Sequence, residues 1–256
     1  MSENVVLKVN RLGIDFGGLT AVNNFNMEIM PNEIIGLIGP NGAGKTTVFN
    51  LLTKVYEPTR GEIYLNDKSL EKMSTVEVNQ LGIARTFQNI RLFSNMSVLE
   101  NVLIGEHNGI AYKTVNAIFR TPSYYKEEKA AKERAVELLK LFHLEEFEDA
   151  QASSLPYGAQ RRLEIARALA TNPCLLLLDE PAAGMNPSET VELMNTIRTV
   201  RDKFHISILL IEHDMKLVMG ICERITVLNY GQVLATGTPE EIQNNPQVIK
   251  AYLGGV

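Results

Sequence analysis

The stretch Gly39-Pro40-Asn41-Gly42-Ala43-Gly44-Lys45-Thr46 decides the fold of this sequence. It matches the pattern G-x-x-x-x-G-K-[ST], which is typical of a phosphate-binding loop between a strand and a helix. An apolar run over residues 33–39 predicts the buried strand before the loop, and we expect a helix to begin near Lys45. A glycine-rich turn that matches the pattern by chance is the alternative, and the strand and helix around it disfavour that reading.

The residue types of this phosphate loop suit a nucleotide. Its glycines let backbone N–H groups converge on phosphate oxygens, and Lys45 brings a cation to the outer phosphates. The Thr46 hydroxyl can ligate Mg²⁺, because Mg²⁺ prefers oxygen ligands. The nucleotide contacts that we expect are Gly39, Pro40, Asn41, Gly42, Ala43, Gly44, Lys45, Thr46 and Thr47.

A second apolar run, over residues 174–178, ends in two carboxylates, Asp179 and Glu180. Ligands bind beyond the carboxyl ends of the strands in open α/β sheets. Asp179 can therefore hold Mg²⁺, directly or through water. Glu180 is the better candidate for a base that orients a water molecule against the terminal phosphate. Taken alone, a solvated acidic turn explains this pattern equally well, but together with the phosphate loop it predicts a metal and a base.

His213 follows a third apolar run, over residues 208–211, and should lie at the edge of the same sheet. A histidine at that place could sense or polarise the terminal phosphate. Spacing alone favours the alternative, a surface or capping histidine. No cysteine and histidine cluster has the spacing of metal ligands.

The composition excludes several classes of protein. The chain has 256 residues, 45% hydrophobic and 21% charged, so it is neither disordered nor collagen-like. A net charge of −5 without a basic block argues against nucleic acid as a partner. Cys174 and Cys222 are too few for a disulfide framework and indicate reduced cytosolic thiols. The start of the chain lacks a secretory signal, and no apolar run approaches the ~20 residues that span a bilayer.

Apolar strands that alternate with helices in the second half predict a parallel α/β core. The patterns Ser74-Thr-Val-Glu77 and Ser97-Val-Leu-Glu100 are capping boxes that predict helix starts. Residues 105–122 have weak periodicity and are expected to form an irregular insertion. Strands are expected at 5–9, 25–29, 33–39, 62–65, 174–178, 206–211 and 225–228, and helices at 126–144, 160–170, 188–204 and 218–222, with a last one opening at Thr238.

Taken together, these motifs resemble the ATP-binding subunits of ABC transporters. The order of the phosphate loop, Asp179-Glu180-Pro181 and His213 is that of the family, and residues 160–169 resemble the helix after its signature loop. The resemblance covers nearly the whole chain. It implies a P-loop NTPase fold over residues 1–256, with a RecA-like core and an antiparallel β subdomain in 1–90 and 160–256, and an inserted helical subdomain at about 91–159.

The resemblance also implies roles for single residues. Phe16 matches the aromatic position that stacks on adenine, and Gln88 matches the glutamine that approaches Mg²⁺ and the attacking water. Glu180 matches the catalytic glutamate and His213 the switch histidine. The implied cofactors are ATP and Mg²⁺, with Thr46, Gln88 and Asp179 around the metal.

Several stretches resemble, more narrowly, the G-type ATPase of branched-chain amino-acid importers. They are residues 39–50, 85–88, 91–101, 211–220 and 245–254. The long insert before Lys126 favours the G-type over its F-type sibling. This implies a peripheral protein on the cytoplasmic face of the plasma membrane. Its partners would be two permease subunits, a second ATPase of the F-type in a heterodimer and, indirectly, a periplasmic or extracellular solute-binding protein.

Two departures from the family pattern concern the surface between ATPase chains. The signature Leu-Ser-Gly-Gly-Gln stands here as Leu155-Pro156-Tyr157-Gly158-Ala159, so the serine hydroxyl that would bond the terminal phosphate is missing. Leu155, Tyr157 and Gly158 remain candidates for contacts to a nucleotide, since backbone N–H groups at a helix start can still face an anion. The usual Asp of the loop after Glu180 is Asn186. We expect the weak signature to impair the partner's site rather than this chain's own.

Other functions remain open at this stage. A related transporter for urea, short amides or exported lipid is the nearest alternative, because the ATPase does not touch the solute. A soluble ABC ATPase acting on ribosomes or DNA usually carries two cassettes or a coiled coil, and this chain has neither. A P-loop kinase or GTPase would leave the signature helix unexplained. By resemblance, Arg91, Leu92 and Phe93 lie near a groove for the permease, and a packing cluster at a helix start is an equal alternative.

Overall fold

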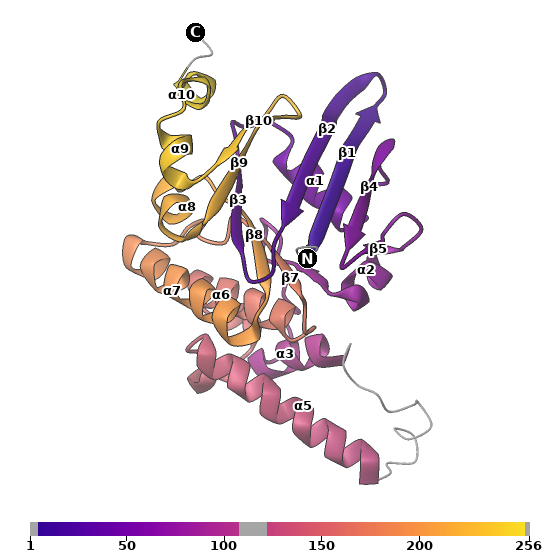
Figure 1. Ribbon diagram of the computed structural model, residues 1–256. Coiled ribbons are helices and arrows are strands. Elements are labelled where there is room, and N and C mark those ends of the chain that lie inside the picture. The colour runs from indigo at the N-terminus through magenta and orange to yellow at the C-terminus, as the bar shows by residue number, and fades with distance from the viewer. Residues whose placement is uncertain (1–4, 108–121, 254–256) are drawn as a thin grey trace.

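The computed structural model describes residues 5–107 and 122–253 (Figure 1). In this part of the chain, four strands form an antiparallel sheet in the order β2-β1-β4-β5. Gly17 and Gly18, both with positive φ, make the tight turn between the first two strands. The strands are β1 (Leu7–Phe16), β2 (Leu19–Ile29), β4 (Arg60–Leu65) and β5 (Lys68–Ser69).

Six further strands within the described residues form the core sheet in the order β10-β9-β3-β8-β7-β6. All its pairs are parallel except that of β9 with the edge strand β10. The carboxyl ends of β3, β7 and β8 therefore meet at one edge, which brings the three predicted motifs together. The strands are β3 (Ile34–Ile38), β6 (Ile83–Arg85), β7 (Leu175–Asp179), β8 (Ser207–Ile211), β9 (Arg224–Asn229) and β10 (Gln232–Gly237).

The central strands are buried on both faces, which explains their unbroken apolar runs. Alternate residues enter two different cores. Ile34 and Ile38 pack with the helices on one face, while Ile35 and Leu37 pack with α1 (Lys45–Leu52) and the antiparallel sheet on the other. The phosphate loop therefore directly follows a strand that is packed on both faces.

The remaining helices cover the core sheet and extend from one end of it. Figure 1 shows α3 and α5 at the bottom of the molecule, α6 and α7 above them, and α10 at the opposite end. Residues Ala135, Leu138, Leu139 and Phe142 are buried together, as their helical spacing predicts. The helices are α2 (Thr75–Leu81), α3 (Val98–Glu106), α5 (Pro122–Leu141), α6 (Tyr157–Leu169), α7 (Pro187–Phe204), α8 (Met215–Ile221), α9 (Pro239–Gln243) and α10 (Pro246–Leu253).

Both predicted capping boxes are confirmed. The Ser74 and Ser97 hydroxyls accept from the N–H groups of Glu77 and Glu100, whose carboxylates bond back to the serine N–H groups. Thr238 caps α9 in the same way. Each box satisfies free N–H groups at a helix start, which is why these positions could be found from the sequence.

The structure adds elements that the patterns did not predict. These are the short strands β5 and β6, the edge strand β10 and the helix α10. The helix expected at 126–144 runs from Pro122 to Leu141, and that expected from 160 begins at Tyr157. Most of the insertion expected at 105–122 lies outside the described residues. Across the described ranges, no helix combines the length and apolar character needed to span a membrane.

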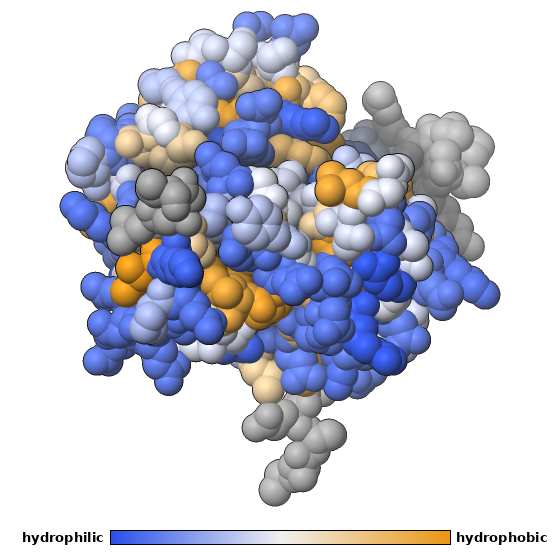
Figure 2. Space-filling model, turned by 90° about the horizontal axis from the view of Figure 1, so that it is seen from above, coloured by the Kyte–Doolittle hydropathy of each residue, from blue (hydrophilic) through white to orange (hydrophobic). Residues whose placement is uncertain are grey.

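The end of the molecule that carries α10 has an apolar groove on its surface. Figure 2 looks down on this end and shows hydrophobic surface between hydrophilic side chains. The groove is formed by helices α8, α9 and α10, with Met215, Met219, Ile242 and Val248 among its lining residues. It is separate from the edge of the core sheet at which the motifs meet.

Candidate nucleotide-binding and active site

The phosphate loop depends on two glycines. A Cβ on Gly39 would lie 2.1 Å from the carbonyl oxygen of Leu228, so no other residue fits there. Gly44 caps α1 with φ 103° and offers no side-chain bond, which leaves the first N–H groups of that helix to a ligand. The loop and the start of α1 therefore form a cradle for an anion, as the sequence predicts.

Lys45 lies at the centre of this cradle. Its ammonium donates to the carbonyl oxygens of Gly39 and Pro40, at 2.7 and 3.0 Å. An ammonium has three N–H donors, so one remains for a phosphate. Burial lowers the pKa of Lys45, and the carboxylates of Glu180 and Asp179 act in the opposite direction. Lys45 thus fixes the shape of the loop and can contact a phosphate from within it.

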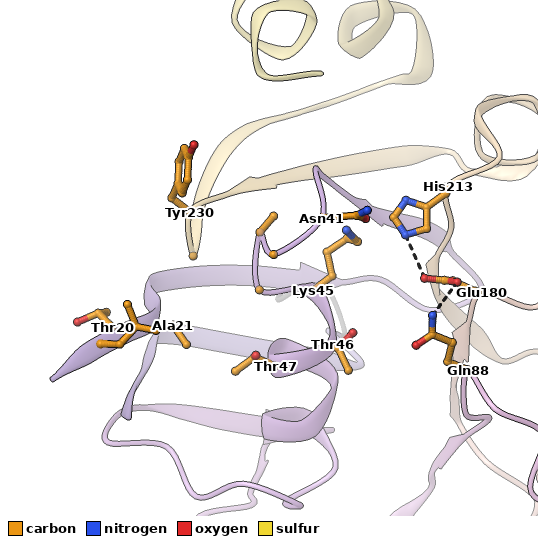
Figure 3. A pocket seen from close by; sticks show the side chains of 15 residues that line it. Thr20, Ala21, Asn41, Lys45, Thr46, Thr47, Gln88, Glu180, His213 and Tyr230 are labelled. Carbon is orange, nitrogen blue, oxygen red and sulfur yellow. Dashed lines mark hydrogen bonds and ion pairs between the residues drawn. The ribbon is translucent and has the colours of Figure 1, made fainter. Parts of the chain in front are cut away.

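A pocket of about 1060 Å³ opens over the loop. Figure 3 shows Glu180, His213 and Gln88 on one side of Lys45, and Thr20, Ala21 and Tyr230 on the other. In the described part of the chain it is lined by Leu19, Thr20, Ala21, Asn41, Gly42, Ala43, Gly44, Lys45, Thr46, Thr47, Gln88, Glu180, His213, Tyr230 and Gly231. Its volume and the polar side chains and glycines of its lining suit a nucleoside triphosphate.

Three side chains meet at one end of the pocket. The Glu180 carboxylate lies 3.0 Å from Nε2 of His213 through one oxygen and accepts from Nε2 of Gln88 at 3.1 Å through the other. These residues follow three different strands, β7, β8 and β6. Glu180 has φ 48°, a conformation that glutamate rarely adopts. A carboxylate held in this way can orient a water molecule and accept its proton.

Asp179 lies at the end of β7 but does not line the pocket. One oxygen of its buried carboxylate is paired with Arg85 at 2.8 Å, and Arg85 also donates to Asn50 of α1 at 2.7 Å. The pair ties three elements of the site together. Within the described ranges, no group of three or more histidine, cysteine, aspartate or glutamate residues is placed to hold a metal ion. The oxygen donors present, Thr46, Gln88 and Asp179, fit Mg²⁺, which is usually bound by one or two carboxylates together with substrate phosphates.

A buried ion pair on α6 holds the backbone on either side of Gln88. Arg161 and Glu164 are paired at 2.9 Å, with side chains almost fully buried. Arg161 donates to the carbonyl oxygens of Phe87 and Gln88, at 2.5 and 2.6 Å. Glu164 accepts from the N–H groups of Phe87 and Arg91, at 3.4 and 3.2 Å. The helix after the signature loop, α6, therefore holds the backbone of the segment that carries Gln88 through hydrogen bonds.

The signature loop lies apart from this chain's own pocket. None of Leu155, Tyr157 and Gly158 is among the described residues that line it. Pro156 caps α6 without a side-chain bond, and the Tyr157 side chain is exposed. Asn186 caps α7, where its side chain accepts from the N–H groups of Ser188 and Glu189. Asn186 therefore has a local role, whatever it contributes to a surface between chains.

The structure shows pocket residues that the motifs did not reveal. Phe16 does not line the pocket among the described residues, and its ring packs edge-on against Tyr56. Leu19, Thr20 and Ala21 line it instead, from the strand after the turn. Tyr230 and Gly231 form the hairpin turn between β9 and β10, and the Gly231 N–H donates to Ala43 of the loop. The Tyr-Gly pair in the sequence was the one available signal of this turn.

Comparisons with known proteins identify the family of this chain. The family model described as "ABC transporter" matches residues 22–183, and that described as "Branched-chain amino acid ATP-binding cassette transporter" matches residues 232–256. The chain belongs to the ATP-binding proteins of ABC transporters, which hydrolyse ATP to drive transport.

Relatives narrow the branch of the family. The high-affinity branched-chain amino acid transport ATP-binding protein LivG of Escherichia coli K12 is 53% identical, with 97% of this chain and 98% of that protein covered. BraF of Pseudomonas aeruginosa, which has the same description, is 47% identical over the same shares. The lipopolysaccharide export ATP-binding protein LptB of Acidithiobacillus ferridurans is 35% identical, covering 99% of this chain and 98% of that protein.

A solved structure supports the same fold. A nucleotide-free ATP-binding cassette of an ABC transporter superposes with a TM-score of 0.84 at 32% identity, covering 98% of this chain and 99% of that one. Both the predicted fold class and the predicted membership of the branched-chain amino acid transport branch are confirmed.

Proposed function

We propose that the chain powers the uptake of branched-chain amino acids into the cell, by hydrolysing ATP on the cytoplasmic face of the plasma membrane. The observation that carries this proposal is the meeting of Lys45, Glu180 and His213 in one pocket, in a chain 53% identical to LivG of Escherichia coli. The pocket supports ATP hydrolysis, and the kinship supports the solute.

The arrangement of the pocket suggests how each residue acts. The phosphates rest on the loop and on Lys45, and the terminal phosphate faces Glu180 and His213. Glu180 accepts the proton of the attacking water, while Gln88 and His213 hold its carboxylate in place. The adenine lies at the opposite end, beside Thr20 and Tyr230, with Phe16 close by in the chain.

Mg²⁺ is the proposed cofactor, held by Thr46, Gln88 and Asp179. When bound, it neutralises charge on the phosphates that are being separated. The ion pair with Arg85 uses one oxygen of Asp179, Oδ2. Arg85 therefore holds the Asp179 carboxylate in a fixed orientation at the base of the site.

The proposed assembly contains two permease subunits and a second ATPase of the F-type, with an external solute-binding protein acting on the permease. In it, two ATPase chains enclose two ATP molecules. The signature loop of this chain, residues 155–159, would complete the partner's pocket. Its position away from this chain's own pocket supports that arrangement.

The proposed surface for the permease lies around Phe93, in the helical part at about 91–159. Buried Asn101 holds the Phe93 backbone, donating to its carbonyl oxygen and accepting from its N–H. The ring is 48% exposed and lies 5.4 Å below the Arg167 guanidinium. A small cavity beside it is lined in part by Ile104 and Ala168. A rigid backbone that presents an exposed aromatic ring beside a cavity suits the docking of a helix.

The test is to purify the tagged chain in mild detergent, identify the proteins that accompany it, and measure ATP-driven leucine uptake in vesicles. The proposal predicts two permeases, a second ATPase and leucine uptake. Recovery with a lipid-export complex, or uptake of another solute alone, would contradict the proposed solute while leaving the ATPase site in place.

A charged substitution tests the docking surface. Phe93→Glu should release the permease and leave ATP binding unchanged, because Phe93 is not among the described residues that line the pocket. The matched control is Phe147→Glu, since Phe147 is a similarly exposed phenylalanine on the 3₁₀ turn Glu145–Phe147. Co-purification of permease with each variant gives the answer. Equal retention of permease by both variants would place the docking surface elsewhere.

A further inference from the structure

Glu212 has no part in the roles described so far, although it directly precedes His213. It follows β8 and is only 4% exposed, which is unusual for a glutamate. It does not line the nucleotide pocket as far as the described residues show. A buried carboxylate is costly unless hydrogen bonds compensate it, so its partners indicate what it does.

The Glu212 carboxylate joins two loops of the site. One oxygen accepts from the N–H of Ala182 at 2.8 Å, two residues after Glu180. The other accepts from the N–H groups of His213 and Asp214, at 2.9 and 3.2 Å. Burial raises the pKa of Glu212 and these three N–H donors oppose that rise, as bonds to the charged form do. Each oxygen therefore serves a different loop.

The loop that Glu212 holds contains a strained residue of the site, Glu180. Glu180 has φ 48°, in the left-handed region, which is unfavourable for a residue with a side chain. Such a conformation persists only where surrounding bonds enforce it. Two bonds from neighbouring segments do so here. The Glu180 N–H donates to the carbonyl of Ile211, and the Ala182 N–H donates to Glu212.

We propose that Glu212 is a positioning residue for ATP hydrolysis, whose carboxylate ties the loop of Glu180 to the loop of His213. Its bridge keeps the Glu180 carboxylate and the His213 ring at hydrogen-bonding distance from each other. Glu212 acts through the backbone N–H groups of Ala182, His213 and Asp214, and so through the loops that carry Glu180 and His213. An amide at this position has one carbonyl oxygen, so it cannot accept from both loops in the same way.

The first test is Glu212→Gln in the purified transporter that contains this chain. We expect kcat for ATP hydrolysis to fall about 10- to 100-fold, because small displacements of reacting groups have effects of that order. The KM for ATP should stay within about twofold, because the phosphate loop is not disturbed. Glu212→Asp is a second variant. It retains the charge, but its shorter side chain cannot span both loops, so the same split between kcat and KM is expected.

Two controls separate positioning from general destabilisation. Ser207→Ala removes a part-buried hydrogen bond, 2.7 Å long, from the hydroxyl at the other end of the same strand to the carbonyl oxygen of Met30. It should lower the unfolding temperature and leave kcat unchanged. Asp214→Asn removes the charge next to His213 and keeps the cap of α8, since Asn and Asp cap helices about equally well. It should also leave kcat unchanged.

A double-mutant cycle with His213→Ala completes the test. If Glu212 acts through the two loops, adding Glu212→Gln to a His213→Ala variant should lower kcat by less than about a further twofold. The effects of coupled residues are not additive. Three results would overturn the proposal. The first is a wild-type kcat in both Glu212 variants. The second is a fall in kcat that Ser207→Ala reproduces when its unfolding temperature is equally low. The third is full additivity of Glu212→Gln with His213→Ala.

Discussion

The pocket and the signature loop of this chain differ in how completely they are built. At the pocket, Lys45 bonds its own loop, Glu180 bonds His213 and Gln88, and the core sheet fixes every segment. At the signature loop, the residue that caps α6 is Pro156, which makes no side-chain bond, and the Tyr157 side chain is exposed. The pocket is built from contacts within this chain, whereas the signature loop has an exposed side chain and no side-chain cap.

This difference indicates a division of work. In the proposed mechanism, the pocket carries the groups that bind phosphates and activate water, so it is the part of the chain that would hydrolyse ATP. The signature loop supplies backbone N–H groups at a helix start, which can bind an anion. In the proposed assembly this anion is a phosphate of the nucleotide in the partner's pocket. Arg161 and Glu164 connect the two regions, because the helix behind the signature loop grips the backbone at Gln88.

The largest effect is expected from a substitution in the pocket. Glu180→Gln should lower kcat about a thousandfold and leave ATP affinity unchanged, since it removes the base and keeps the side-chain shape. Turnover and nucleotide binding by the assembled transporter measure this. The exposed capping carboxylate in Glu241→Gln is the control. An equal loss from the matching change in the partner ATPase would refute the proposed inequality of the two sites.

A smaller effect is expected from the connection between the regions. Arg161→Met leaves the Glu164 carboxylate buried without its partner and should cost at least about 3 kcal/mol of unfolding free energy. The neighbouring Arg162→Met breaks a partly exposed pair, 3.7 Å long, and should cost less than about 1 kcal/mol. Chemical denaturation of both variants measures the difference. Equal losses of unfolding free energy would mean that the Arg161–Glu164 pair is not what holds the two regions together.

The smallest effect is expected in the signature loop itself. Pro156→Ser restores a capping hydroxyl at the start of α6 and should stabilise the fold by about 1 kcal/mol. Asn186→Ala, which removes the existing cap of α7, should destabilise it by a similar amount. Thermal unfolding of the two variants should shift in opposite directions. A shift of the same sign would show that the start of α6 gains no stability from a hydroxyl at position 156.

The sequence predicted the parts of the site that depend on strand ends. The phosphate loop, Asp179-Glu180 and His213 each follow an apolar run, and parallel pairing brings such ends together. Capping boxes were equally readable, because all their bonds are local.

The remaining contacts were beyond reach because they join segments far apart in the chain. Arg161 lies 74 residues from Phe87, and Glu212 lies 30 residues from Ala182. Nothing in the local pattern around Glu212 separates a buried bridge from an exposed carboxylate. Tyr230 and Gly231 enter the pocket only because β10 pairs with β9, and β10 itself was not predicted.

The most direct test of the division of work is to trap nucleotide with vanadate in a transporter that carries Tyr157→Asp, and to determine which ATPase chain is labelled. The new carboxylate would stand at the exposed helix start, where it favours the fold of α6 and repels a phosphate of the partner's nucleotide. The account predicts nucleotide bound in this chain's pocket and lost trapping in the partner's. Loss of binding in this chain's own pocket, with trapping in the partner unchanged, would contradict it.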